Sequence, residues 1–484
     1  MTTVLKVLIG LLGCVGLGRL LVQLLAGRVP RGGTGGSSAS VISTAEVWGL
    51  SLCAGVAGIG WCSFFWSLAG GPLGSAFSWG LTAIGLIGGV MTHFSPVRST
   101  LTKLKSEDQS PVAHACQILI GVLIIAAIVQ TLLTPQRFWD ERAIYAIKAK
   151  VLWYEGSVHS PILHEADFVQ YHPKYPLLLP LAEQHFYGLL DGAHDRWPKV
   201  LFPLMYAGLV LTFAGVCARR LSPAWGWFCG LMLATTPVLM PYEYGFLCAQ
   251  ADAPVACFHG LAVLYLWDAL HEVDDSLRRR LVAISAAAAA SAAFIKDEGL
   301  AFLVIDFIAC ALAMLFSGRT EHQTRFGAAE WGLLIGVAAI LLTPWLIHRR
   351  GLPSTTEMNY FGRMTLSLLI ERLPTLGWSV PHLLAKMFRE WHTWGLHWWL
   401  AAAAVITMPA RAKTAPQQFL IWNLLGTLAA LLLAGMVAPA ELEEHLGGST
   451  HRYLMQLVPA AWLLVAGQWA DRAVRLSESP RNER

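Results

Sequence analysis

Two short stretches of this chain carry acidic and basic side chains next to apolar runs. Asp140-Glu141 begins where an apolar run ends, and Lys174 follows later between two prolines. A carboxylate at a membrane surface can act as a general base that removes a proton from an acceptor, with a neighbouring acid that orients it. The same two acids could equally mark a helix start, where negative charge is favoured by the helix dipole. A lysine there could bind a lipid phosphate or simply extend its charge to the surface.

Further ionisable residues stand near the ends of later apolar runs. Asp252 enters one run by about a helical turn, and Pro254 frees nearby backbone groups. Lys296, with Asp297-Glu298-Gly299, forms a predicted tight turn, and Arg452 opens the last run. Because ionisable groups at membrane depth are costly, they are usually functional or paired. The structural alternatives are an internal pair for Asp252, a solvated turn at Lys296 and a membrane anchor at Arg452.

Aromatic and amide side chains flank these charges. Their rings could stack on a sugar or an isoprenoid chain, although tryptophan and tyrosine also anchor proteins at the membrane interface. The candidate substrate-lining residues are Trp139, Tyr171, Tyr175 and Gln250.

The composition predicts that membrane-spanning helices hold these residues. Of 484 residues, 55% are hydrophobic and only 14% are charged, and the mean hydropathy is +0.52. Long, unbroken apolar runs favour helices, because lipid offers the backbone no hydrogen-bond partners. We predict an all-α polytopic membrane protein with about 12–13 transmembrane helices. The net charge of +4 gives no sign of nucleic acid, and the nine cysteines lie mostly in apolar runs as core residues.

Apolar segments of spanning length divide the chain. We predict N-terminal segments over residues 1–110 with a Gly/Ser-rich linker at Gly32–Ser40, a transmembrane core with the candidate site residues over residues 111–470, and a cytoplasmic tail over residues 471–484. Within the external loop 135–196, Leu177 to Leu190 carries Glu183 and Pro180, so we predict an interfacial helix there. The predicted spans are roughly 4–25, 46–69, 76–94, 114–134, 199–218, 224–241, 247–270, 281–296, 299–316, 330–347, 397–410, 417–437 and 452–470.

Basic residues in the short loops fall on one side, which the positive-inside rule makes cytoplasmic. The candidate site residues then share the external side. The basic external segments Arg137–Lys150 and Arg349–Arg389 oppose this assignment, and Lys6 and Arg19 leave open whether the first segment spans. The basic residues on the cytoplasmic side are Arg28, Arg31, Arg98, Lys103, Lys105, Arg219, Arg220, Arg278, Arg279, Arg280, Arg319, Arg325, Arg411, Lys413, Arg472, Arg475, Arg481 and Arg484.

The order of these motifs resembles the GT-C class of membrane glycosyltransferases, especially the bacterial aminoarabinose transferase and protein O-mannosyltransferase branch. The similarity covers roughly residues 114 to 470. Two departures are the Asp-Glu within the usual Lys-Gly turn and the extra N-terminal segments. The motifs that carry the resemblance are Asp140-Glu141, Lys174-Tyr175-Pro176, Asp252, Lys296-Asp297-Glu298-Gly299, Thr343-Pro344-Trp345 and Arg452-Tyr453.

The resemblance implies transfer of a hexosyl or pentosyl group from a polyprenyl-phosphate donor to a lipid, protein or glycan acceptor. The reaction would invert the anomeric carbon at the periplasmic face of a bacterial inner membrane. Asp140 would be the general base, Glu141 its helper and Asp252 a second acid. The donor phosphate would lie against Lys174, Arg452 and Lys296, where charge develops in the transition state. No cofactor is expected, although an acidic pair can hold a divalent cation.

Two other functions fit parts of the pattern. A secondary transporter would use Asp252, Lys296 and Asp297 to relay ions, and a non-catalytic scaffold would bind lipid phosphates through Arg349–Arg389. Only an enzyme needs Asp140, Asp252, Lys174 and Arg452 around one externally open cavity. Asp306, in the middle of its span, is expected to pair within the bundle.

Overall fold

The computed structural model describes residues 2–26, 42–94, 110–241, 243–317, 326–354, 360–408, 414–439 and 442–478. In these ranges the chain is helical and has no β-strand, which confirms the predicted all-α class. Nine of the described helices are long and apolar enough to cross a membrane. They are α1 (Thr3–Ala26), α2 (Thr44–Leu68), α3 (Ser75–Phe94), α4 (Pro111–Leu133), α7 (Leu201–Arg220), α9 (Asp252–His271), α11 (Glu298–Phe316), α12 (Ala328–His348) and α18 (Ala415–Val437).

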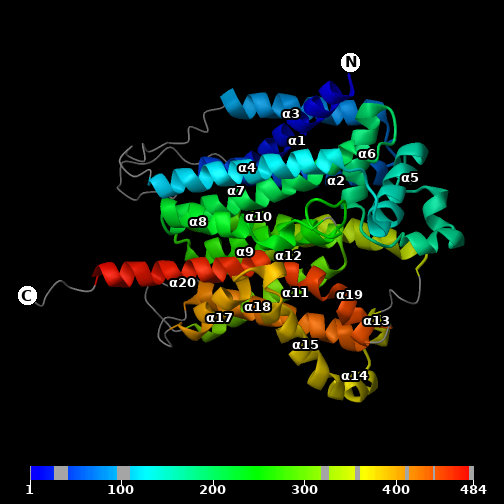
Figure 1. Cartoon of the computed structure of the whole chain (residues 1–484). Coiled ribbons are helices and arrows are strands. Elements are labelled where there is room, and N and C mark those ends of the chain that lie inside the picture. Colours follow the sequence, from blue (N-terminus) through cyan, green and yellow to red (C-terminus); the bar gives the residue numbers. More distant parts are fainter. Residues whose placement is uncertain are drawn as a thin grey trace, which may run out of the picture.

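Four more helices continue the same up-and-down path along the bundle (Figure 1). These are α8 (Pro223–Ala234), α10 (Asp275–Ile295), α17 (His397–Ile406) and α20 (Val458–Glu478). Each predicted apolar segment therefore overlaps a helix, but some ends differ. Helix α8 stops before Pro237, since proline cannot continue the backbone hydrogen bonds. Arg452 lies on the separate helix α19 (Leu442–Met455) rather than at the start of α20.

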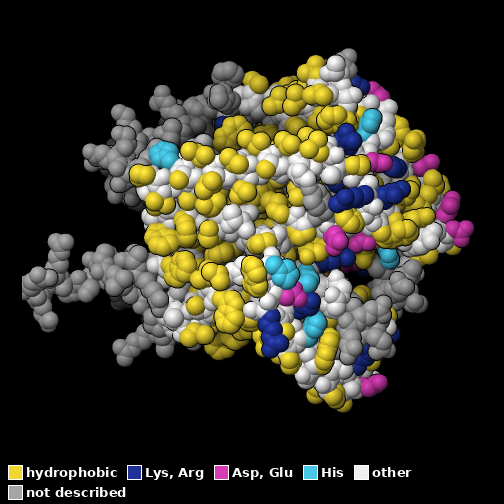
Figure 2. Space-filling view, in the orientation of Figure 1, with side chains coloured by type: hydrophobic (Ala, Val, Ile, Leu, Met, Phe, Trp, Pro, Cys, Tyr) yellow, Lys and Arg dark blue, Asp and Glu magenta, His cyan; other side chains and the backbone are white. Residues whose placement is uncertain are grey.

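The shorter elements gather at one end of the bundle. We call this end, with residues 134–196, 349–354 and 360–396, the loop end, and the opposite end, with Arg219 and Arg220, the arginine end. Figure 2 shows apolar side chains along the bundle and charged and histidine side chains concentrated near the loop end. The short elements there are η1 (Asp140–Ala146), α5 (Ile147–Glu155), η2 (Pro161–His164), η3 (Ala166–Tyr171), α6 (Leu178–Leu190), η4 (Trp197–Val200), η5 (Pro237–Leu239), η6 (Arg349–Gly351), α13 (Tyr360–Arg363), α14 (Leu366–Arg372), η8 (Leu373–Thr375), α15 (Leu376–Arg389) and α16 (Trp391–Trp394).

The N-terminal helices pack directly onto the rest of the bundle. A Cβ atom built on Gly18 of α1 would lie 1.9 Å from the Ser51 carbonyl oxygen of α2. One built on Gly49 of α2 would lie 2.6 Å from the backbone nitrogen of Thr212 in α7. Small residues let the helix backbones approach this closely, as is common between membrane helices. Helix α2 thus joins α1 to the core, whereas α3 packs on α1 and α6.

Helix α6 differs from the predicted interfacial helix in its surroundings. It is helical over Leu178–Leu190, but all of its residues are buried, including Glu183. Helices α2, α3 and α5 pack around it, so it lies inside the protein at the loop end. Gln136 donates a hydrogen bond to Glu183 (3.1 Å), which accommodates the acid in this interior position.

Several predicted features fall outside the described residues. They are the Gly/Ser-rich linker at Gly32–Ser40 and the basic residues Arg28, Arg31, Arg98, Lys103, Lys105, Arg319, Arg325, Arg411, Lys413, Arg481 and Arg484. The nine cysteines are all described; they are free thiols and mostly buried, as their positions in apolar runs predict.

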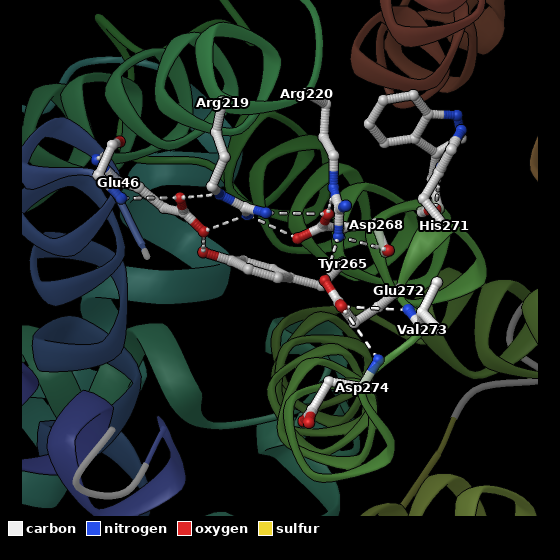
Figure 3. Close-up of polar contacts among 11 residues, drawn as sticks. Glu46, Arg219, Arg220, Tyr265, Asp268, His271, Glu272, Val273 and Asp274 are labelled. Carbon is white, nitrogen blue, oxygen red and sulfur yellow. Dashed lines mark hydrogen bonds and ion pairs between the residues drawn. The ribbon is translucent and has the colours of Figure 1, made fainter. Parts of the chain in front are cut away.

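A buried ionic cluster ties three helices together at the arginine end (Figure 3). Arg219 of α7 lies between Glu46 of α2, at 3.0 Å, and Asp268 of α9, at 2.6 Å. Arg220 also bonds Asp268 and reaches Glu272 at 2.8 Å. These two arginines, which sequence reasoning treated as loop charges, are therefore neutralised inside the protein. They contribute less to membrane orientation than their position in the chain suggested.

The hydroxyl of Tyr265 completes this cluster by donating to Glu46 Oε1 at 3.2 Å. We expect Tyr265→Phe to lower the stability of the folded protein by about 2 kcal/mol, because a hydrogen bond to a buried charged group is lost. Thermal unfolding of the purified protein in detergent measures the change, with exposed Tyr154→Phe as the control. Equal unfolding midpoints for the two variants would contradict this role.

Candidate functional site

Asp140 lies at the start of η1, directly after the chain leaves α4. Its Oδ2 atom accepts a hydrogen bond from Nη2 of Arg452 at 2.9 Å. The two residues, on η1 and α19, are 312 positions apart in the sequence and meet at the loop end. Both side chains remain partly exposed, at 24% and 27%. The first predicted catalytic acid therefore contacts a predicted phosphate-binding residue.

Asp252 lies on the other side of the same arginine. At the first residue of α9 it is fully buried, and its Oδ2 accepts from Nε of Arg452 at 2.9 Å. Its Oδ1 accepts from the ammonium group of Lys296 at 2.9 Å. Both oxygens are thus occupied by cations. Asp252 is suited to hold Arg452 and Lys296 in place rather than to take up a proton.

The predicted turn after α10 joins two helices to this cluster. Lys296 also pairs with Glu298 at 2.7 Å and lies 5.6 Å from the centre of the Tyr453 ring. The neighbouring Asp297 receives two hydrogen bonds from Arg349, at 2.7 and 3.0 Å. The mixed charges of the turn are therefore paired with specific partners. We call Asp140, Arg452, Asp252, Lys296 and Glu298 the charged relay.

A cavity of about 940 Å³ opens at the loop end beside Asp140 and Arg452. Trp139 is 69% exposed at its edge, and Gln250 lines it with a buried Oε1 atom that lacks a hydrogen-bond partner among the described residues. Such an atom is available to a ligand or to water. The lining residues are Phe138, Trp139, Asp140, Pro237, Val238, Met240, Pro241, Glu243, Tyr244, Gln250, His392, Thr393, Gly448, His451 and Arg452.

Glu141 points away from this cavity and is completely buried. Its Oε2 accepts the backbone N–H groups of Arg137 and Phe138, and its Oε1 accepts that of Ala249 at 2.7 Å. The Lys199 ammonium is 3.2 Å away. Burial opposes ionisation, but these N–H groups and Lys199 outweigh it and lower the pKa of Glu141. Glu141 fixes the start of η1, and so positions Asp140.

Three other predicted site residues lie apart from the cavity lining. Lys174 donates to the hydroxyl of Ser354 at 3.2 Å and is not in contact with the charged relay. Tyr171 packs against Phe168, with ring centres 5.0 Å apart. Tyr175 stacks on His172, also at 5.0 Å. The segment that carries them instead covers a buried lysine.

This buried lysine is Lys148 of α5, which sequence reasoning did not single out. Its ammonium donates to the backbone oxygens of His172 (3.2 Å) and Tyr175 (3.4 Å) and faces the rings of Tyr145 and Tyr175. Burial lowers the pKa of Lys148 to about 7, and the Asp297 carboxylate only partly opposes this effect. Lys148 thus holds the segment before α6 against α5.

The stability of the protein should depend on Lys148 in a pH-dependent way. Its pKa is about 7 in the folded protein and 10.5 ordinarily, so between these values the unfolded chain binds more protons. The contribution is fully present above pH 10.5 and lost as the pH falls through 7. We expect the stability of the wild type relative to Lys148→Met to increase as the pH rises from 7 to 10.5. Unfolding midpoints of both proteins across the window test this, and a constant difference would contradict it.

Sequence reasoning also missed side chains that complete the cavity and its support. Lys199 begins the span after the long loop, and its partner Glu141 could have been inferred only from the fold. His451 precedes Arg452 directly and bonds Glu390, which also pairs with Lys386 at 2.6 Å. Only the position of His451 next to Arg452, a predicted phosphate-binding residue, could have indicated from the sequence that His451 lines the cavity.

The acidic pair Asp140-Glu141 does not form a joint metal site, because its two carboxylates point to different partners. Among the described residues, no group of three His, Cys, Asp or Glu side chains is arranged to hold a metal ion. The charge beside the cavity is provided instead by Arg452 and the lysine behind it.

No family model matches this chain, and no curated protein or solved structure is similar enough to count as a match. The interpretation of the site therefore depends on its own geometry and chemistry.

Proposed function

We propose that the protein is a membrane glycosyltransferase of the GT-C type that uses a polyprenyl-phosphate sugar as donor. The observation that carries this proposal is the position of Arg452, which contacts both Asp140 and Asp252 at the edge of an open cavity. A candidate base and a candidate phosphate-binding cation thereby border one cavity, and an inverting displacement would place the anomeric carbon of the sugar between them. Of the four residues that an enzyme is expected to bring together, Asp140 and Asp252 both contact Arg452, whereas Lys174 lies apart.

Asp140 is the proposed general base. Its Oδ2 bonds Arg452, while its Oδ1 has no hydrogen-bond partner among the described residues. The acceptor hydroxyl would give its proton to this carboxylate as its oxygen forms a bond to the anomeric carbon. The bond from that carbon to the phosphate oxygen breaks, and its electron pair leaves with the polyprenyl phosphate. This single displacement inverts the configuration.

Arg452 is the proposed ligand of the leaving phosphate. Its guanidinium is a planar donor that suits phosphate oxygens and stays charged. A donor phosphate on Arg452 would compete with Asp140 for its N–H groups and so make the base more available. Lys296 and Asp252 lie behind the arginine and hold it in place. We propose that Asp252 and Glu141 are positioning residues rather than catalytic ones.

We propose that this cavity faces the periplasm from a bacterial inner membrane, where a lipid-linked sugar would serve assembly of the cell envelope. A lipid, protein or glycan acceptor would enter from the open side of the cavity, along Trp139 and Gln250. An exposed tryptophan at such an edge can stack on the apolar face of a sugar.

Incubation of the purified protein with a panel of polyprenyl-phosphate sugars and candidate acceptors tests the function. Mass spectrometry should detect release of free polyprenyl phosphate together with a glycosylated acceptor for at least one donor. Exchange of lipid between vesicles without any change in donor mass would refute the transferase and favour a scaffold.

One buried group favours the alternative of a secondary transporter. Asp306, in the middle of α11, accepts a hydrogen bond from Asn423 at 2.6 Å and lies 3.4 Å from Nε2 of His259. Polar groups at this depth are typical of ion pathways. They also confirm the expectation that Asp306 pairs within the bundle. Asp306→Asn should leave sugar transfer unchanged, whereas it would abolish ion-coupled uptake by a transporter.

A further inference from the structure

The proposed function leaves the basic segment Arg349–Arg389 unused. Its described residues 360–389 form a projecting part of the loop end. Helices α14 and α15 lie below the bundle at its edge (Figure 1). Large apolar side chains are exposed on α14 and on η8, which follows it: Leu366 at 74%, Ile370 at 63% and Leu373 at 57%. Apolar surface of this kind on a membrane protein is expected to contact lipid.

Helix α15 has two distinct apolar faces. Ser379, Leu383 and Met387 are buried against the bundle, where α15 packs on α17, α18 and α19. Val380 and Leu384 point outward and are 37% and 49% exposed. The second face therefore has no cover from the described part of the chain.

This second face forms one wall of a groove of about 380 Å³ between α15 and α17. The indole N–H of Trp399, on α17, donates to the carbonyl oxygen of Phe388 at 3.2 Å and joins the two walls. The lining is apolar except for one cation, Arg389. The residues that line it are Pro381, Leu384, Ala385, Phe388, Arg389, Trp399 and Ala402.

Arg389 stands at the end of this apolar lining, and its side chain is exposed. The nearest acid in sequence, Glu390, is already engaged by Lys386 and His451. Within the described residues Arg389 has no carboxylate partner. The groove thus combines an exposed guanidinium with an apolar floor, which complements a molecule with an anionic head and a hydrocarbon chain.

The side chains around the groove are typical of the boundary between membrane and water. Helix α17 begins at His397, and farther along it Ile406 is 81% exposed, as a lipid-facing residue would be. Trp391 and Trp399 are 74% and 55% exposed on either side of this helix start. Exposed tryptophans mark the headgroup level of a bilayer. A lipid whose headgroup lies at Arg389 could therefore extend its hydrocarbon chain along α17.

We propose that the groove between α15 and α17 binds one anionic phospholipid of the leaflet at the loop end. Its phosphate lies on Arg389, and one acyl chain packs on Leu384 and Trp399 before following α17 into the bilayer. A soluble phosphate would leave the apolar walls uncovered, and a protein segment would have to displace lipid from α17. This inference is independent of the proposed sugar transfer, since no residue of the groove lines the cavity at Asp140.

Native mass spectrometry of the full-length protein tests this proposal. The protein is reconstituted in nanodiscs with equal amounts of phosphatidylglycerol and phosphatidylcholine, released, and the retained lipids are counted. We expect the wild type to retain phosphatidylglycerol preferentially and Arg389→Gln to retain about fivefold less of it, as loss of one basic contact implies. Leu384→Asp should have a similar effect because it places a like charge in the acyl-chain path.

Arg142→Gln is the matched control, because Arg142 is also an exposed arginine at the loop end but lies outside the groove. It should retain lipid like the wild type. Size-exclusion profiles show whether each variant is folded, and Arg389→Lys should restore part of the retention. Equal retention by wild type, Arg389→Gln and Leu384→Asp would overturn the proposal, as would equal retention of the two lipids.

Discussion

Asp140→Asn is expected to lower the rate of sugar transfer by at least about 100-fold, the typical contribution of a general base. The amide keeps the size of the side chain and can still accept a hydrogen bond from Arg452, but it cannot take up the acceptor proton. The cavity and the charged relay should persist. Binding of the donor should therefore change little while turnover collapses. Release of polyprenyl phosphate over time, followed by mass spectrometry, measures the rate.

Asp167→Asn provides the control for this substitution. Asp167 is an exposed acid on η3 at the same end of the protein and does not line the cavity. It should retain full activity. Wild-type turnover by Asp140→Asn would refute the assignment of the base, whereas loss of donor binding by that variant would mean that Asp140 mainly orients Arg452.

Asp252→Ala is expected to destabilise the folded protein by about 3–5 kcal/mol, the cost of removing one partner from a buried ion pair. The substitution leaves Lys296 and Arg452 close together without the carboxylate that separates their charges. Activity should fall as well, because Arg452 loses one of its two anchors. Thermal unfolding in detergent measures the stability.

Two further variants show whether the loss of stability is specific to the ion pairs of Asp252. Asp275→Ala removes an acid whose side chain is 65% exposed and pairs with Arg278, so its effect should stay below about 1 kcal/mol. Asp252→Ala combined with Lys296→Met also removes one of the two cations that Asp252 pairs with and should recover part of the lost stability. If Asp252→Ala and Asp275→Ala unfolded at the same temperature, the charged relay would not stabilise the fold.

The sequence allowed the members of the charged relay to be predicted because charges are costly in apolar segments. Asp252 and Lys296 stood out at the ends of long apolar runs, and the structure pairs them at 2.9 Å. Which acid would bond which base could not be predicted, because the partners come from distant helices. The pairing of Arg452 with both Asp140 and Asp252 depends on how α9 and α19 pack.

The side-chain directions of Asp140 and Glu141 could not be predicted from their immediate neighbours in the sequence. Neighbouring residues in a helix do not face the same way, so only one of them can point into a given cavity. Sequence spacing could not indicate which one. The N–H group of Ala249, in the segment before α9, selects Glu141 for the interior, and Asp140 is left beside Arg452.

The buried position of α6 was also beyond sequence reasoning. Its acid, its amide and its proline suggested a helix at the membrane surface. The structure instead places one oxygen of Glu183 on the amide of Gln136 and buries His185, whose Nε2 lies 3.2 Å from the hydroxyl of Thr82. Polar residues in a short apolar helix can serve such internal contacts as well as contact with water.

The location of the donor tests the account most directly. A polyprenyl-phosphate sugar that carries a photoreactive diazirine on the sugar is cross-linked to the purified protein, and the labelled peptides are identified by mass spectrometry. Labelling should fall on the cavity wall, at Trp139–Asp140 or Gly448–Arg452, and natural donor should compete for it. Competed labelling confined to other parts of the protein, such as α12 or the groove between α15 and α17, would contradict a transfer site at Asp140 and Arg452.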